Sequence, residues 1–223
     1  MKTYTERGAR RVFAGALEWP GWCRGARDED GALEALTAYG PRYAAVVRDT
    51  GFAFSAPATA AGLDVVEWVK GDATTDYGAP SIAPAADTEP LSARQLTRLR
   101  ELLEACWTAL DRAADAAEGI ELSKGPRGGG RDLPAILAHV AGAEASYLSK
   151  LAAPRPKLGE TDPRAALAAA HAATLEALHV AVTEGVPATG PRGGALWTAR
   201  YFLRRDAWHV LDHAWELEDR VKA

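Results

Sequence analysis

The sequence predicts an α+β protein that is mainly α, in which a four-helix bundle follows a small α+β domain. From Leu91 onward, apolar residues recur every three or four positions, as in amphipathic helices. Segments rich in glycine and proline divide this part into four stretches, each long enough for a bundle helix. Short apolar runs beside turn residues precede it and are typical of strands. We therefore expect an α+β domain over 1–72, a linker over 73–90 and the bundle over 91–223.

Composition places the chain among soluble globular proteins. It has 223 residues, of which 48% are hydrophobic and 25% charged. The net charge of −4 argues against a nucleic-acid-binding surface that spans the protein. Cys23 and Cys106 lie far apart, as expected of free thiols in a reducing cytoplasm. No stretch of about 18 apolar residues is present, and no apolar run follows the first residues, so we expect no membrane span, no signal peptide and a cytoplasmic location.

The N-terminal part alternates strand and turn signals. Pro20 and Gly21 form a turn between two short apolar runs. Asp28 is placed to cap a helix, which Pro41 would kink unless a new first turn begins there. The stretch 71–90 has no periodicity and is interpreted as a linker or surface loop. The expected elements are strands over 11–17 and 22–26, a helix over 30–48 and a strand over 63–69.

Four long helices are expected in the second part. Ser92, Asp132 and Asp162 each stand before an apolar periodic run, where their side chains can cap the first turn. Proline follows within the first turn of the second and third helices, a position that tolerates it. In an up-down bundle the second and fourth helices would run parallel. The expected helices cover 92–119, 132–153, 162–185 and 195–221.

The last of these helices carries a histidine pair. His209 and His213 are four residues apart, so their imidazoles share one helix face, and Glu216 lies near the same face. His139, on the second helix, is the candidate third ligand. Three imidazoles with an open position would form a catalytic type of divalent metal site. The alternative is that these are ordinary core histidines, because a pair at this spacing also occurs by chance.

Four arginines come shortly before, or at the start of, the second and fourth helices. Helix N-termini favour anions, so these arginines suggest a carboxylate- or thiol-bearing substrate, with Arg127 and Arg192 as candidate binding residues. The alternative is that the arginines only solubilise the loops. The set is Arg127, Arg131, Arg192 and Arg200.

Other polar residues in the helices have less specific interpretations. His171 falls on the apolar stripe of the third helix and fits a place in the core or behind the ligands, whereas His179 fits a solvated position. Neither is assigned to the metal. Arg204 and Arg205 are expected to pair with nearby carboxylates of the same helix (Asp206, Asp212 or Glu216) and so to orient ligands.

The second part resembles a known superfamily. Leu137-Ala138-His139-Val140 with Glu144 and Tyr147, followed by His209-x-x-x-His213, resembles the DinB/YfiT-like proteins over about residues 91–222. Those proteins are four-helix bundles with one metal-binding histidine on the second helix and two on the last. The resemblance implies a divalent metal, zinc or nickel, a homodimer, and a metal-dependent hydrolase or a transferase that uses a low-molecular-weight thiol such as mycothiol.

The N-terminal part resembles the HicB-type antitoxin fold. Residues 13–22, followed by Gly25 and the acidic helix start at 28–33, give the order of strand, Pro-Gly turn, strand and helix found there. No DNA-binding segment is visible, so an accessory domain is expected and nucleic acid is not an expected partner. The leading hypothesis is a metalloenzyme that acts on a small molecule. The alternative is a stress-response or binding protein whose N-terminal domain engages a partner and whose metal, if present, is structural.

Overall fold

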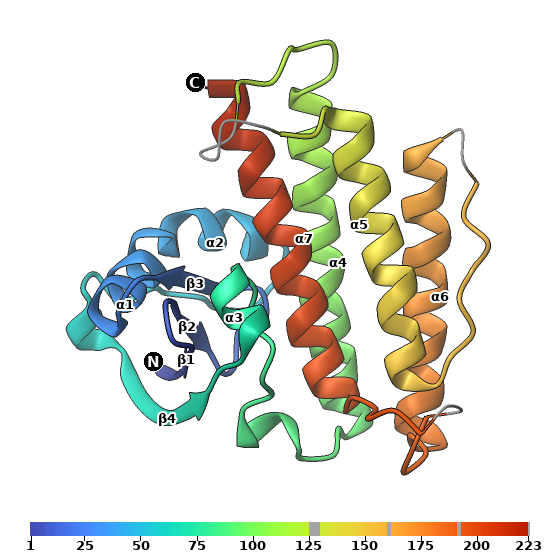
Figure 1. Ribbon diagram of the computed structural model, residues 1–223, viewed down its shortest axis with the longest axis horizontal. Coiled ribbons are helices and arrows are strands. Elements are labelled where there is room, and N and C mark those ends of the chain that lie inside the picture. Colours follow the sequence, from blue (N-terminus) through green and yellow to red (C-terminus); the bar gives the residue numbers. More distant parts are fainter. Residues whose placement is uncertain (125–129, 160–161, 191–192, 223) are drawn as a thin grey trace.

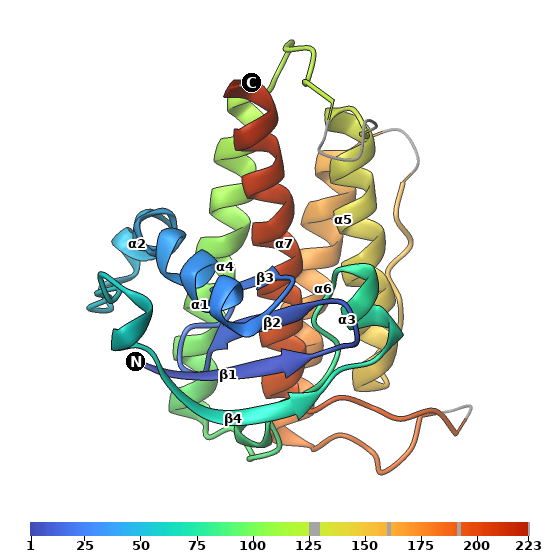
Figure 2. The same ribbon diagram turned by 60° about the vertical axis from the view of Figure 1, so that its left-hand side comes forward.

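The computed structural model confirms the predicted fold class. It describes residues 1–124, 130–159, 162–190 and 193–222. Of the residues it describes, 56% are helical, and a small mixed sheet precedes the helical region. Figures 1 and 2 show the sheet beside α7 (Ala199–Lys222), with α6 (Pro163–Thr183) at the far side of the bundle.

The N-terminal sheet has one strand more than the sequence predicted. Its order is β3-β2-β1-β4, and β1 pairs antiparallel with β2 and parallel with β4 (Figure 2). The unpredicted strand is β1, whose Thr3, Thr5 and Glu6 are polar yet buried, so it carries no apolar alternation. The strands are β1 (Lys2–Arg7), β2 (Val12–Ala16), β3 (Cys23–Ala26) and β4 (Asp64–Lys70).

The helix predicted over 30–48 is two helices, α1 (Glu29–Ala38) and α2 (Gly40–Val47). Pro41 lies in the first turn of α2, where its missing N–H has no consequence, so a new first turn begins there; this is the exception that the sequence left open. Asp28 caps α1 as expected, since its side chain accepts a hydrogen bond from the backbone N–H of Gly31.

The stretch predicted as a linker packs into the structure. It contains α3 (Ala73–Tyr77) and a 3₁₀ turn, Ala85–Asp87. The buried Asp87 carboxylate accepts hydrogen bonds from Arg204, whose Nη1 also donates to the carbonyl of Ala16 at 2.7 Å. Arg204 therefore pairs with Asp87 and not with a carboxylate of its own helix, which corrects the prediction. The domain boundaries at 72 and 91 stay a prediction.

The turn between β2 and β3 brings the sheet against α7. Gly21 has a φ of +89°, and a Cβ there would come within 2.8 Å of the Leu211 side chain. Glycine is therefore required at position 21 for two reasons: the turn needs a positive φ, and a side chain would collide with α7. Tyr43 donates from its hydroxyl to the carbonyl of Pro20 at 2.8 Å and holds the same turn from α2.

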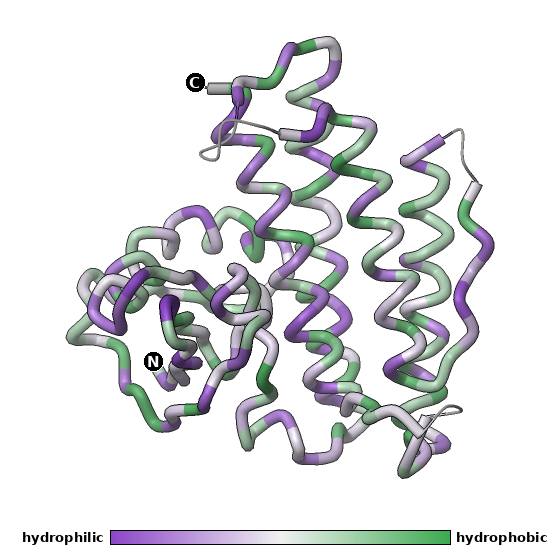
Figure 3. Tube along the Cα trace, in the orientation of Figure 1, coloured by the Kyte–Doolittle hydropathy of each residue, from purple (hydrophilic) through white to green (hydrophobic). Residues whose placement is uncertain are grey.

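Four long helices form the bundle, and three of them start at the predicted caps. The side chains of Ser92, Asp132 and Asp162 each accept a backbone hydrogen bond at the start of their helix. Hydrophilic and hydrophobic residues alternate along α4 and α7 (Figure 3). The helices are α4 (Ala93–Ala116), α5 (Leu133–Tyr147), α6 (Pro163–Thr183) and α7 (Ala199–Lys222).

The directions of the helices differ from the expected up-down order. The N–H of Trp197, before α7, donates to the carbonyl of Lys150, after α5, at 2.8 Å. At the other end, Nη1 of Arg220 donates to the carbonyl of Arg131 at 2.8 Å. Helices α5 and α7 are therefore antiparallel, and the prediction of parallel helices was wrong. The chain after α5 returns along the bundle before α6 begins, so that α5 and α6 run parallel (Figure 1).

Helix α6 packs along α5. Among the described residues, it is the helix whose length and composition would allow it to cross a membrane, a test that core helices of soluble proteins also pass. Cys23 and Cys106 are free and buried, as expected.

Candidate metal centre

Three histidines from two helices converge on one point. His139 comes from α5, and His209 and His213 come from α7. One ring nitrogen of each lies within 4.8 Å of the others. The Nε2 atoms of His139 and His209 are 3.3 Å apart. This cluster could hold a metal ion, which agrees with the prediction made from the spacing of the pair and from His139.

His139 and the histidine pair are counted from the same end of the bundle, because α5 and α7 are antiparallel. His139 lies six residues from the start of α5, and His213 lies nine residues from the end of α7. At about 1.5 Å per residue these are about 9 Å and 14 Å from the same end of the bundle. An offset of about one helical turn between the two helix ends brings His139 and His213 level.

Glu216 and Arg220 orient His213. Nδ1 of His213 lies 2.8 Å from Oε2 of Glu216, and Nη1 of Arg220 donates to Oε1 of the same carboxylate at 3.0 Å. The hydrogen bond from His213 lowers the pKa of Glu216 from its ordinary value. A carboxylate that engages Nδ1 leaves Nε2 free for a cation, which is the usual arrangement behind a metal-bound histidine.

The electrostatics favour neutral imidazoles with free lone pairs. Burial lowers the pKa of His139 to about 4 and lowers that of His209 well below its ordinary value. Two neutral Nε2 atoms that face each other at 3.3 Å repel unless a proton or a cation lies between them. Their separation and the all-nitrogen donor set fit a divalent transition metal.

A largely buried polar layer connects α4, α5 and α6 inside the bundle. The indole of Trp107 donates to Glu144 at 3.0 Å and stacks on the His171 ring at 3.9 Å between centroids. Nε2 of His171 lies 3.4 Å from the other Glu144 oxygen, so His171 is a core group and not a ligand. Asp206 is fully buried. The burial of Asp206 was not predicted from the sequence. Its position one turn before His209 on the same helix was the signal that could have indicated it.

Burial raises the pKa of Glu144 to about 8. Between pH 4.5 and 8 the folded protein therefore holds a proton that the unfolded chain releases, and stability falls as pH rises through this range. Above pH 6.5, His139 and His171 contribute little to this dependence, because burial lowers the pKa of each to about 4.

Glu144→Gln should flatten this pH dependence, because the amide keeps an acceptor for Trp107 and has no proton to lose. We expect metal-depleted wild-type protein to lose stability between pH 6.5 and 8, by up to about 1.4 kcal/mol per pH unit for this proton, and the variant to lose less. Urea unfolding at the two pH values measures this, with the exposed Glu101→Gln as control. Equal slopes in wild type and Glu144→Gln would contradict a protonated Glu144.

The predicted arginine cluster does not form between the residues that can be placed. Arg131 lies before α5, at the end of the bundle that holds the C-terminal end of α7. Arg200 lies at the opposite end and donates to the carbonyl of Glu89 at 3.3 Å. The prediction failed because it assumed parallel helices. Arg127 and Arg192, the predicted binding residues, lie outside the described residues.

Comparison with known protein families, curated proteins and solved structures finds no match to this chain. The likeness to the DinB/YfiT-like and HicB-type proteins therefore stays a resemblance in residue pattern.

Proposed function

We propose that this chain is a metalloenzyme, a metal-dependent hydrolase or a transferase of a low-molecular-weight thiol, in which His139, His209 and His213 hold a divalent cation. The observation that carries the proposal is the approach of three ring nitrogens from two helices to within 4.8 Å of one another. Zinc or nickel suits an all-imidazole donor set. The resemblance to DinB/YfiT-like proteins supports the same site and the same reaction classes.

The chain's own residues set up the site for chemistry. The two helices fix the three rings, and Glu216 holds His213 in the orientation that frees Nε2. A divalent cation bound there would supply Lewis acidity, which polarises a substrate group or lowers the pKa of water or a thiol. Burial keeps His139 and His209 neutral at physiological pH, so they do not repel the cation.

An open site is favoured over a closed structural one by the composition of the cluster. Among the described residues the cluster comprises three ligands, whereas structural zinc sites have four. His139 is only partly buried, so the cluster reaches solvent. These features favour a site that leaves one position for a substrate.

Cobalt substitution tests whether that position exists. Protein reconstituted with Co²⁺ should change its visible absorption spectrum when a small thiol or azide is added, because the added ligand enters the coordination shell. An unchanged spectrum at saturating ligand would favour a closed, structural site and would contradict the enzymatic proposal. Failure to bind Co²⁺ would contradict the metal site itself.

Glu216→Gln should weaken metal binding by about 10- to 100-fold, as is usual when the partner behind a metal-bound histidine is lost. The amide is neutral and no longer balances the His213 ring and the Arg220 guanidinium. Competition with a chromophoric chelator gives the dissociation constants. Glu176→Gln, an exposed position on α6, should bind metal as the wild type does. If both variants bound equally well, Glu216 would have no role in holding His213.

A further inference from the structure

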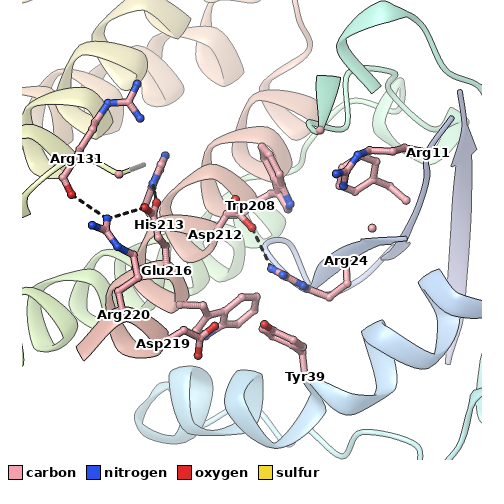
Figure 4. Close-up of a pocket in the computed structure, with 15 residues that line it drawn as sticks. Arg11, Arg24, Tyr39, Arg131, Trp208, Asp212, His213, Glu216, Asp219 and Arg220 are labelled. Atoms are coloured by element: carbon pink, nitrogen blue, oxygen red, sulfur yellow. Dashed lines mark hydrogen bonds and ion pairs between the residues drawn. The ribbon is translucent and has the colours of Figure 1, made fainter. Parts of the chain in front are cut away.

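A large pocket lies at the seam between the sheet and α7 (Figure 4). Its volume is about 650 Å³, within the range of small-molecule sites. His213 and Glu216 line it, so the pocket adjoins the candidate metal centre. Arg11, Phe13, Arg24 and Tyr39 reach it from the N-terminal part, and Arg131 reaches it from the residue before the cap of α5.

Two aromatic pairs bridge the seam and form walls of the pocket. Phe13 of β2 meets Trp208 of α7 edge to face, with 6.0 Å between ring centroids. Tyr39, at the end of α1, meets Trp215 of α7 at 4.9 Å. Each pair takes one ring from the N-terminal part and one from the bundle, so the pocket exists only because the two parts are packed together. These walls suit an apolar or aromatic ligand body.

The carboxylates of the pocket are already paired. Asp212 lies 3.0 Å from Arg24, and Arg24 also lies over the Tyr39 ring at 4.0 Å. Glu216 pairs with Arg220 at 3.0 Å. The remaining carboxylate, that of Asp219, pairs with Arg42 of α2, also at 3.0 Å.

Two arginines remain without such a partner. In the part of the chain that the structure describes, the side chains of Arg11 and Arg131 pair with no carboxylate, although both line the pocket. One comes from the N-terminal part and the other from the bundle. The pocket therefore presents two uncompensated positive charges beside aromatic walls.

We infer that this pocket binds a small organic oxyanion with an aromatic or apolar body, whose anionic group pairs with Arg11 and whose body packs on Trp208 and Phe13. This inference rests on the proposed function, because the pocket holds a substrate only if the adjoining metal centre is catalytic. The N-terminal part then determines specificity, because it supplies Arg11 and Phe13. A carboxylate and a phosphate ester share the chemistry that the arginines recognise.

Titration calorimetry on metal-depleted protein tests the inference with benzoate, phenyl phosphate and the neutral analogue benzamide. We expect saturable binding of at least one anion and at least tenfold weaker binding of benzamide. Whichever anion binds more tightly identifies the favoured oxyanion. Arg11→Gln should weaken anion binding by about tenfold or more, which corresponds to about 1.4 kcal/mol, and Arg131→Gln, on the opposite side of the pocket, should weaken it less. The exposed Arg94→Gln, at the start of α4, should bind as the wild type does.

Three results would overturn the inference: no saturable binding of either anion up to about 10 mM, equal affinity for benzoate and benzamide, or unchanged affinity in Arg11→Gln. Circular dichroism shows whether each variant is folded. Because the binding is measured without metal, a failed metal site leaves this result standing. Conversely, if the metal site is confirmed but no anion binds, the inference about the pocket is refuted and the proposed metal site is not.

Discussion

His209→Ala protein should bind a divalent metal more than about 100-fold more weakly than the wild type, because loss of a ligand costs more than loss of the partner behind one, which costs about 10- to 100-fold. His209 is the most buried of the three histidines and lies 3.3 Å from His139 across the cluster. Elemental analysis after dialysis, together with chelator competition, gives stoichiometry and affinity. His139→Ala should behave alike, since it removes the ligand that the other helix supplies.

The matched control is His179→Ala. His179 is an exposed histidine on α6, away from the cluster, and its replacement should leave the metal content unchanged. Folding of each variant is checked by circular dichroism, so that metal loss is not confused with unfolding. Stoichiometric metal in folded His209→Ala would mean that the three imidazoles do not form the site.

Arg204→Ala should destabilise the protein by about 3–5 kcal/mol, because it leaves a buried carboxylate without its counter-charge. The Arg204 guanidinium contacts Asp87 and the carbonyls of Ala16 and Leu17, so it joins the segment before α4, the sheet and α7. Urea unfolding monitored by circular dichroism measures the loss.

Arg200→Ala is the control for this variant. Arg200 is one turn earlier on α7 and partly exposed, and it bonds only to backbone carbonyls among the described residues, so we expect a loss below about 1 kcal/mol. The double variant Arg204→Met with Asp87→Asn should recover part of the stability, since it removes both buried charges. Equal unfolding midpoints for wild type and Arg204→Ala would show that the buried pair does not join the two parts.

Local signals in the sequence predicted most helices and the three histidines that cluster. The caps at Ser92, Asp132 and Asp162 set the helix starts because each side chain satisfies a free N–H in the adjacent turn. The His209 and His213 pair follows from helix periodicity alone. Such features depend on neighbours within one turn, which the sequence shows directly.

Features that depend on distant partners could not be predicted in this way. Strand β1 is held by pairing with β2 and β4, and its buried Thr3 and Glu6 carry no apolar pattern. The partner of Arg204 lies 117 residues away at Asp87, so charges nearby on the helix were misleading. The direction of α6 is set by the return of the chain after α5, and no local motif encodes it. The pocket at the seam arises from the same long-range packing.

We propose that His139, His209 and His213 share one cation. A crystal of protein loaded with zinc or nickel, measured on both sides of that metal's absorption edge, tests it most directly. We expect one strong anomalous peak about 2.0–2.1 Å from a ring nitrogen of each of the three histidines. A peak elsewhere, or none at the cluster in metal-saturated crystals, would contradict the account.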